Sequence, residues 1–563
     1  MHTHRGFSYD AIVVGSGAGG GMATYMLTKA GHRVLLLEAG RHYDPLTETP
    51  MFHTYADAPL RGTRTPHKHF GYYDATVDGG WEVPGEPYTV APGSEFLWWR
   101  ARMLGGRTNH WGRFSLRFSH HDFNGFSRDG HGADWPFDYQ AIAPWYDEAE
   151  KLIGVCGNNP GIEDIPDSAP GVLHKPPRPR VPELLMAAAA AKLGIPMVPM
   201  RRAILTHDMD DRQACFWTTN CGKGCSIGAA FQTTTSLLPM ADSTGRLRIV
   251  TDAMVSRIHV NDSGRASGVD YVDRRSGETV TLDADVIVLS ASACESARIL
   301  LNSRSDKLPD GVANSSGQVG RNLMDSTGAA IPGYVPALEN RPRYNEEGHT
   351  ANHLFIPWWG YEDQAKGKLD FPRGYHFEVG GAFPTPGMSV GASAAGYGHA
   401  LKERVRRRYG ASVNLSLRGE MLPNRHCFMQ IDPAVRDRWG IPVPRFHWRW
   451  GDHELKQVAH GMKTARAIIE TMGGYVYYPD RTPEEAIKKG GEIIHEVGTT
   501  RMGSNRQTSV TNQWGQTWDV PNLFVMDGGV FVSNPHKNCT LTLMTLAMRN
   551  ADHLATAMHR GQV

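Results

Sequence analysis

The sequence predicts an α/β fold at the N-terminus and a second, largely antiparallel region further along the chain. Near the N-terminus, an apolar run at 9–14 leads into a glycine cluster, a helix-like stretch at 22–30 and a second apolar run at 33–37. This order is typical of a strand–helix–strand unit whose strands are parallel and buried. From about 332 to 479, short extended runs rich in aromatic residues alternate with Gly and Pro, which favours an antiparallel sheet with loops. With 563 residues, the chain is long enough for two or more domains.

The glycine cluster has the spacing of a dinucleotide-binding fingerprint. Gly15, Gly17 and Gly20 form G-x-G-x-x-G directly after a predicted strand and at the start of a predicted helix. The glycines let the backbone approach a pyrophosphate, which the free N–H groups of the helix N-terminus stabilise. Glu38 ends the second strand, where its carboxylate can accept hydrogen bonds from a ribose. The unit predicts a Rossmann-like domain and leaves open whether the dinucleotide is NAD or FAD.

The remaining predicted elements follow in chain order. A Pro- and Arg-rich stretch at 174–182 precedes a helix-like run at 183–194, and we expect it to connect two lobes. Strand-like runs come next, at 247–258, 266–272, 279–282 and 286–289. The C-terminal part returns to an apolar strand at 523–526 and an amphipathic helix at 540–558.

The composition limits the classes of protein to consider. The chain has 40% hydrophobic and 21% charged residues, which is typical of a globular protein. A net charge of +1 gives no electrostatic reason to expect nucleic acid or an acidic membrane as partner. The longest apolar runs, such as 541–548, are far shorter than the roughly 20 residues of a membrane-spanning helix, so we expect no membrane span. The first residues lack an apolar signal-peptide core and a twin-arginine pair, and we expect no export signal in this chain.

Several segments resemble, in the same order, the motifs of the glucose-methanol-choline (GMC) oxidoreductases, a family whose dinucleotide is FAD. These segments are 13–23 with 34–40, 102–112, 283–303, 320–325, 495–503, and 522–528 with 538–542. The resemblance implies the GMC fold, with a discontinuous FAD-binding domain at 1–331, which includes a cysteine loop at 214–229, and at 485–563. The segment 332–484 is expected to form the substrate-binding domain, with the active site between the two domains.

The resemblance also implies further cofactor-binding residues. The segment 102–112 is similar to the family's second glycine motif, which lies against the flavin and implies contacts from Gly105, Gly106, Asn109 and His110. Asp527 in the C-terminal motif is implied in the same role. The order of residues around His110 is also similar to that in pyranose 2-oxidases, where a histidine binds the flavin covalently. Noncovalent binding is the alternative.

Two residues are expected to carry the chemistry. Oxidation of an alcohol needs one group that accepts the hydroxyl proton and another that accepts the hydride, and a neutral imidazole suits the first task. The resemblance implies that His495 is the base, that Asn538 holds the substrate hydroxyl, and that FAD accepts the hydride at N5. Cys539 stands where a proline is common in the family, which affects backbone rigidity more than chemistry.

A second candidate centre is a cysteine cluster, Cys215, Cys221 and Cys225, which contains three of the seven cysteines. Three thiolates without a fourth ligand nearby make a poor structural zinc site. A disulfide would leave one thiol over and is unfavourable in a reducing compartment. Gly222 and Gly224 would let the loop wrap around an inorganic cluster, whose irons are held by cysteine thiolates. A loop of buried thiols without a cofactor is the alternative.

The segment 214–241 resembles bacterial FAD-dependent glucose dehydrogenases and glucoside 3-dehydrogenases of the same family, in which three cysteines hold a [3Fe–4S] cluster. This resemblance implies oxidation of a secondary alcohol of a sugar or glycoside to a keto-sugar, at C3. Electrons are expected to pass through the cluster to a cytochrome-type acceptor, with a small partner subunit. Export with that subunit would give a periplasmic location, and a cytoplasmic location is the alternative.

Four other functions stay open at this point. The first is an oxidase of the pyranose 2-oxidase type that uses O2, and the second is oxidation of another alcohol or polyol. A lyase or non-catalytic flavoprotein on the same fold is the third, and an NAD-dependent enzyme is the fourth.

Overall fold

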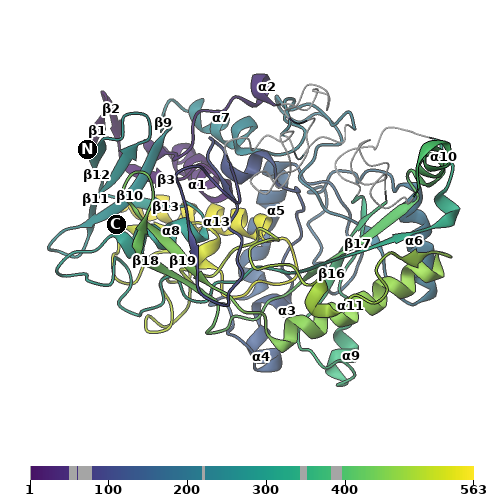
Figure 1. Ribbon diagram of the computed structural model, residues 1–563. Coiled ribbons are helices and arrows are strands. Elements are labelled where there is room, and N and C mark those ends of the chain that lie inside the picture. Colours follow the sequence, from purple (N-terminus) through teal and green to yellow (C-terminus); the bar gives the residue numbers. More distant parts are fainter. Residues whose placement is uncertain are drawn as a thin grey trace.

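The computed structural model describes residues 2–49, 60, 79–217, 222, 224–342, 352–381 and 396–563. Figure 1 shows two parts side by side. The part on the left contains both chain termini, and the part on the right contains a long antiparallel sheet. Cys221 of the predicted cysteine cluster lies outside the described residues.

A parallel sheet forms the centre of the part on the left. Its strands are β3 (Ala11–Val14), β4 (Val34–Leu37), β9 (Leu247–Val250), β13 (Ile287–Leu289) and β21 (Leu523–Val525). The order across the sheet is β21, β13, β3, β4, β9, and every neighbouring pair is parallel. Four of these strands are buried along their whole length, because helices cover the sheet.

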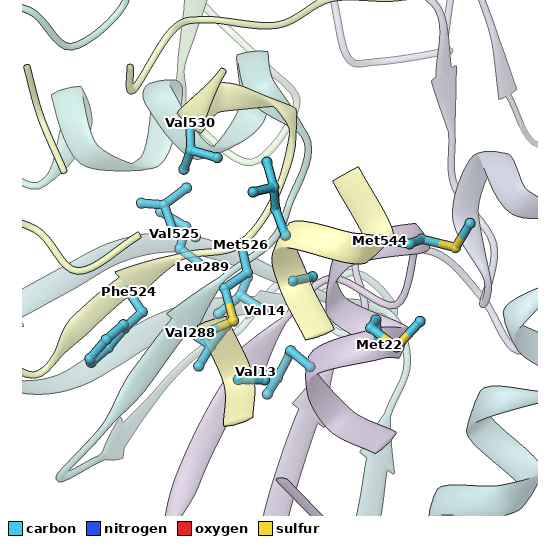
Figure 2. Close-up of a cluster of buried hydrophobic side chains, with 14 of the residues drawn as sticks. Val13, Val14, Met22, Val288, Leu289, Phe524, Val525, Met526, Val530 and Met544 are labelled. Atoms are coloured by element: carbon cyan, nitrogen blue, oxygen red, sulfur yellow. The ribbon is translucent and has the colours of Figure 1, made fainter. Parts of the chain in front are cut away.

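Two helices from opposite ends of the chain pack together on this sheet. They are α1 (Ala18–Lys29) and α13 (Thr540–His559). Figure 2 shows Met22 of α1 and Met544 of α13 beside the strand residues Val13, Leu289 and Val525. A third helix, α8 (Ala293–Asn302), follows β13. The sheet therefore brings segments from the two ends and the middle of the sequence into one core.

An antiparallel sheet of three strands adjoins this core. It consists of β10 (Ala253–Val260), β11 (Ala266–Asp273) and β12 (Thr279–Asp283), paired in that order. α8 contacts β10 on one side. It also contacts β18 (Phe428–Arg436) and β19 (Pro442–His447). β19 pairs with β18 on one side and with β6 (Thr89–Val90) on the other.

The part on the right is a six-stranded antiparallel sheet with its own apolar core. Its strands are β8 (Val198–Pro199), β14 (Thr327–Tyr334), β15 (Leu354–Ile356), β16 (Tyr375–Gly380), β17 (Ser412–Gly419) and β20 (Tyr475–Val476). The order is β20, β14, β17, β16, β15, β8. The helices α6 (Val181–Lys192) and α11 (Asp452–Thr471) complete this second core.

Further strands and helices complete the described fold. The strands are β1 (His2–His4), β2 (Phe7–Tyr9), β5 (Gly79–Gly80) and β7 (Arg100–Ala101). The helices are α2 (Pro45–Glu48), α3 (His120–Phe123), α4 (Gly125–Asp129), α5 (Tyr139–Ile153), α7 (Leu237–Asp242), α9 (Tyr361–Ala365), α10 (Gly398–Arg408) and α12 (Pro483–Ala486). Within the described part of the chain, none of the helices combines the length and hydropathy needed to cross a bilayer.

The predicted fold class is confirmed, because both the parallel unit and the antiparallel sheet are present. The first helix begins at Ala18 rather than at 22, so part of the glycine cluster is its first turn. A Cβ at Gly19 would lie 1.9 Å from the carbonyl oxygen of Met526. Glycine is a poor helix former, but here it permits close contact between the helix and the C-terminal segment.

Candidate active site

The first glycine motif lies in the turn between β3 and α1. Gly15 has φ +95°, and a Cβ there would lie 2.4 Å from the carbonyl oxygen of Ser290, so only glycine fits. A Cβ at Gly20 would lie 1.8 Å from the carbonyl oxygen of Gly15, which ties this glycine to helix–strand packing. No described atom lies within 4 Å of the position that a Cβ would take at Gly17. The backbone at Gly17 is therefore open to a ligand at the N-terminus of α1, where free N–H groups favour a phosphate.

Glu38 and Ser16 join the two glycine motifs. Glu38 follows β4 and accepts hydrogen bonds from both the backbone N–H (3.0 Å) and the hydroxyl (2.5 Å) of Ser16. The Ser16 hydroxyl oxygen accepts a hydrogen bond from the N–H of Gly105 (2.8 Å). A Cβ at Gly106 would lie only 3.5 Å from the Cα of Gly17. The second motif thus lies against the first, as two segments that share one cofactor should.

A cavity of about 380 Å³ extends from this turn to the C-terminal motifs. Most sequence-predicted site residues line it, namely Gly15, Gly17, Glu38, Gly106, His110, His495, Asp527 and Asn538. Gly20, Gly105 and Asn109 are not among the lining residues. Asn109 instead stabilises the turn of the second glycine motif, because its Nδ2 donates a hydrogen bond to the carbonyl oxygen of Leu104 (2.8 Å).

The residues of this cavity fit FAD. The open backbone at Gly17 suits a pyrophosphate, and the Glu38 carboxylate is placed to accept hydrogen bonds from a ribose. In addition, His110 Nδ1 and Glu496 Oε1 are buried cavity atoms that have no hydrogen-bond partner among the described residues. Because buried polar atoms are nearly always paired in folded proteins, a ligand with polar groups is expected to contact them.

His495 also lines this cavity and is held on three sides. Its backbone N–H donates to Asp325 (2.9 Å), its Nδ1 lies 2.9 Å from the hydroxyl oxygen of Ser326, and its Nε2 lies 3.5 Å from Asn538 Nδ2. Burial and the nearby Arg418 lower the pKa of His495 to about 3. The imidazole is therefore neutral at physiological pH, which is the form that can accept a proton.

Asn538 contacts a buried ion pair on the antiparallel sheet. Its Nδ2 donates to Oε1 of Glu378 on β16 (3.1 Å), and the other oxygen of Glu378 pairs with Arg418 on β17 (3.0 Å). Burial raises the pKa of Glu378, but Arg418, His376 (Nε2 3.9 Å from Oε1) and the hydrogen bond from Asn538 bring it down to about 2. Glu378 is therefore a carboxylate at physiological pH. Asn538 Oδ1 is buried and has no partner among the described residues.

A buried lysine stands directly before Asn538 in the chain. The ammonium of Lys537 donates to Asp122 (2.8 Å) and Asp164 (2.6 Å), and His536 Nε2 lies 3.1 Å from Asp164. Asp164 also accepts from the hydroxyl of Tyr361 (2.8 Å). Burial alone would raise the pKa of each carboxyl group, but Lys537 outweighs it and holds both pKa values below the ordinary value. Asp122 of α3 and Tyr361 of α9 are thereby linked, through Lys537 and Asp164, to the segment that carries Asn538.

Other buried carboxyl groups lie in or beside the cavity wall: Glu496 and Asp527 line the cavity, and Asp325 lies behind it, where it accepts from the backbone of His495. Burial and the neighbouring Glu496 raise the pKa of Asp325 to about 7. Glu496 itself pairs with Arg107 (2.6 Å). Asp527 accepts from the Ser296 hydroxyl (2.5 Å), and burial raises its pKa to about 6.

His110 is placed where the second glycine motif meets the cavity. Its Nε2 accepts a hydrogen bond from the indole N–H of Trp99 (3.0 Å), and burial lowers its pKa to about 3. The imidazole is therefore neutral. Whether it is bonded covalently to the flavin stays a prediction.

The cysteine loop is described in part. Cys215 and Cys225 are buried in one small apolar cluster. The backbone N–H groups of Trp217 and Ala230 lie 3.3 and 3.4 Å from the sulfur atoms of Cys215 and Cys225, respectively. Among the described residues, which exclude Cys221, no group of three His, Cys, Asp or Glu side chains could hold a metal ion.

Hydrogen bonds connect this loop to the cavity. Gln232 Oε1 accepts from the N–H of Cys225 (2.8 Å) and lies 3.5 Å from the guanidinium of Arg113. Arg113 in turn donates to the carbonyl oxygen of Asn109 (3.0 Å), next to His110. The cysteine loop is thus linked to the second glycine motif.

Four residues of this site were missed by the sequence reasoning: Ser326, Glu378, Arg418 and Lys537. Ser326 directly follows a recognised motif and Lys537 directly precedes another, so position alone could have suggested them. Glu378 and Arg418 lie in strands with no local signal, and only the pairing of β16 with β17 brings them to Asn538.

The sequence is similar to those of several characterised oxidoreductases. The chain is 29% identical to a 2-methyl-1,2-propanediol dehydrogenase from Mycolicibacterium austroafricanum, over 97% of this chain and 95% of that protein. It is 26% identical to the fructose dehydrogenase large subunit of Gluconobacter japonicus, over 98% of this chain and 99% of the relative. A C-glycoside 3-oxidase from Arthrobacter globiformis is 28% identical over 54% of this chain and 52% of its own length.

The fold also matches a solved structure. A formate oxidase variant from Aspergillus oryzae RIB40, studied for its FAD modification, superposes with a TM-score of 0.66 at 15% identity and covers 100% of both chains. The N-terminal family model of the GMC oxidoreductases matches residues 9–327, and the C-terminal model matches residues 423–547. The chain therefore belongs to the GMC oxidoreductase family, whose members are FAD-dependent enzymes that act on alcohol groups.

Proposed function

We propose that this chain oxidises a secondary alcohol of a pyranose or glycoside to a keto-sugar, at C3 of the ring, with FAD as cofactor. The observation that carries the proposal is the approach of a neutral His495 to the Asn538 amide, 3.5 Å apart in the wall of the cavity. Similarity to the fructose dehydrogenase large subunit supports a sugar as substrate. Similarity to the C-glycoside 3-oxidase supports the C3 position.

A second candidate function is oxidation of a small diol or another polyol. It is favoured by the relative named 2-methyl-1,2-propanediol dehydrogenase, which matches 97% of this chain. Use of O2 as electron acceptor is a further alternative, favoured by the oxidase among the relatives. Both alternatives employ the same pair of residues and differ in the substrate or in the acceptor.

The roles of the residues follow from their contacts. His495 accepts the hydroxyl proton at Nε2, while Ser326 holds Nδ1. Asn538 donates a hydrogen bond to the substrate oxygen and keeps it in front of Nε2. The open backbone at Gly17 and the Glu38 carboxylate hold the pyrophosphate and ribose. FAD, when bound, supplies the hydride acceptor.

An anaerobic substrate screen tests this function. The holoenzyme is mixed with glucosides, free pyranoses and 1,2-diols, and loss of the oxidised flavin absorbance is followed. We expect glycosides to bleach the flavin fastest and to give a 3-keto product by NMR. Faster bleaching by diols would favour the second candidate, and a flavin that no alcohol bleaches would contradict both. Peroxide formation in air, without another acceptor, would favour the oxidase alternative.

We also propose that Cys215, Cys221 and Cys225 hold a [3Fe–4S] cluster, which would supply one-electron transfer to an acceptor other than oxygen. The burial of Cys215 and Cys225 supports this, as do the backbone N–H groups directed at both sulfur atoms, because such hydrogen bonds accompany cluster thiolates. Iron and sulfide analysis with EPR tests it. We expect a cluster signal that is lost in Cys225→Ser but kept in Cys156→Ser, where another buried cysteine is changed. Purified protein without iron and sulfide would contradict the proposal.

A small partner subunit and a cytochrome-type acceptor complete the proposal. The relative from Gluconobacter japonicus is named a large subunit, which supports a partner of this kind. Export together with that subunit would place the chain in the periplasm. Purification of the native protein, followed by mass spectrometry and cell fractionation, tests both points.

A further inference from the structure

Glu378 on β16 contacts Asn538 with its carboxylate. The side chain of Glu378 is 9% exposed, and its two oxygens are divided between two partners. Oε1 accepts a hydrogen bond from Asn538 Nδ2 (3.1 Å), and Oε2 pairs with Arg418 (3.0 Å). The pairing of β16 with β17, which places Arg418 opposite His376, fixes the carboxylate on the rigid antiparallel sheet.

The chemistry of a carboxylate determines the orientation of the Asn538 amide. An ionised carboxylate can only accept hydrogen bonds, whereas the amide has a donating nitrogen and an accepting oxygen. Glu378 therefore requires the nitrogen of Asn538 to face it. With the amide reversed, two oxygens would lie about 3 Å apart in a buried site, which is strongly unfavourable.

The orientation of Asn538 then determines the tautomer of His495. Nδ2 carries two hydrogens, one of which goes to Glu378, and it lies 3.5 Å from His495 Nε2. Without substrate the second hydrogen faces Nε2, and with substrate bound it passes to the hydroxyl oxygen whose proton Nε2 accepts. A donor beside Nε2 favours the tautomer in which Nε2 is unprotonated. The imidazole proton is then on Nδ1, which donates to the Ser326 hydroxyl oxygen at 2.9 Å.

We propose that Glu378 is a positioning residue that fixes the Asn538 amide and, through it, keeps His495 in the Nδ1–H tautomer with Nε2 free to accept the substrate proton. The inference rests on the proposed role of His495 as the base. Glu378 has a second effect on the reaction. When His495 accepts the proton it becomes an imidazolium, and the nearby carboxylate stabilises this positive charge.

The kinetic test uses the holoenzyme and the variant Glu378→Gln. Glutamine can present either its oxygen or its nitrogen to Asn538, so both amide orientations become possible and the negative charge is lost. We expect the limiting rate constant of anaerobic flavin reduction to fall about 10- to 100-fold, in line with the loss of a charged hydrogen bond, with little change in the substrate concentration for half-saturation. Glu378→Asp, which keeps the charge, should recover part of the rate.

Glu420→Gln is the matched control. Glu420 is also buried, with its side chain 3% exposed, and it pairs with Arg373 at the same distance (3.0 Å) beside the end of β17. No hydrogen bond or ion pair of the described residues joins it to His495 or Asn538. We expect its flavin-reduction rate to stay within about threefold of wild type. Equal rates in Glu378→Gln and wild type, or equal losses in both variants, would overturn the inference.

A second measurement does not depend on any substrate. In protein labelled with [15N]histidine, subtraction of the His495→Ala spectrum identifies the signals of His495 among those of the 26 histidines. We expect wild type to show His495 protonated at Nδ1 and Glu378→Gln to show a mixture of tautomers. A proton on Nε2 in wild type would overturn the inference. If no alcohol reduces the wild-type flavin, the proposed function fails, and the tautomer measurement still decides the role of Glu378.

Discussion

Replacement of Lys537 by Met tests the buried ion cluster behind Asn538. The ammonium of Lys537 bonds two carboxylates, at 2.8 Å to Asp122 and 2.6 Å to Asp164, and all three side chains are at most 3% exposed. Methionine has a similar length but leaves both carboxylates buried without their counter-charge. Removal of one partner of a buried pair typically costs about 3–5 kcal/mol. We expect a loss of this size in the free energy of unfolding, and slower flavin reduction because Asn538 is the next residue.

The assay is guanidinium denaturation of the holoenzyme, followed by tryptophan and flavin fluorescence. Lys307→Met is the control, because its pair with Asp262 is on the surface, at 74% and 96% exposure, and no measurable change is expected. In the double variant Lys537→Met with Asp122→Asn, part of the loss should be recovered, since one uncompensated charge is removed. A Lys537→Met protein as stable as the Lys307→Met control would refute the reasoning.

Three further predictions concern the cavity. Gly15→Ala should fold poorly, because Gly15 has a positive φ and a Cβ there would lie 2.4 Å from a backbone oxygen. Gly17→Ala should fold normally but bind less flavin, because its Cβ meets no described atom and would occupy the space next to the ligand. Far-UV circular dichroism measures the folding of each variant, and the flavin-to-protein ratio measures its cofactor binding. His495→Ala should keep its flavin yet lose about 10²- to 10⁴-fold in the rate of flavin reduction, and an undiminished rate would exclude it as the base. Because burial raises the pKa of Asp325 to about 7 from the ordinary 3.8, the stability that its protonated form contributes is complete below about pH 4 and is lost as the pH rises through 7. Between about pH 5 and pH 8, the denaturation midpoint of wild type should therefore fall more than that of Asp325→Asn, and equal slopes would contradict the assignment.

Local sequence was sufficient wherever a motif and its structural context are contiguous. The run of apolar residues, glycines and Glu38 predicts β3, α1 and β4, because a buried parallel strand and a pyrophosphate turn need these residue types at this spacing. The start of α1 was predicted four residues late, since glycines at positions 19–21 argue against a helix unless something packs closely on them. The Cys221 assignment lies outside the described residues and stays a prediction.

The sequence by itself therefore determined the class of fold and the family, and it predicted His495 and Asn538 as the two residues of the chemistry. Only the tertiary structure decided what surrounds them. Glu378 is 160 positions from Asn538, and Asp164 is 373 positions from Lys537. Such long separations are not visible in local periodicity, because the packing of distant segments against one another selects these partners. The tertiary environment also sets the charge of buried carboxyl groups. Glu378 is ionised because Arg418 lies beside it, whereas burial raises the pKa of Asp325 to about 7.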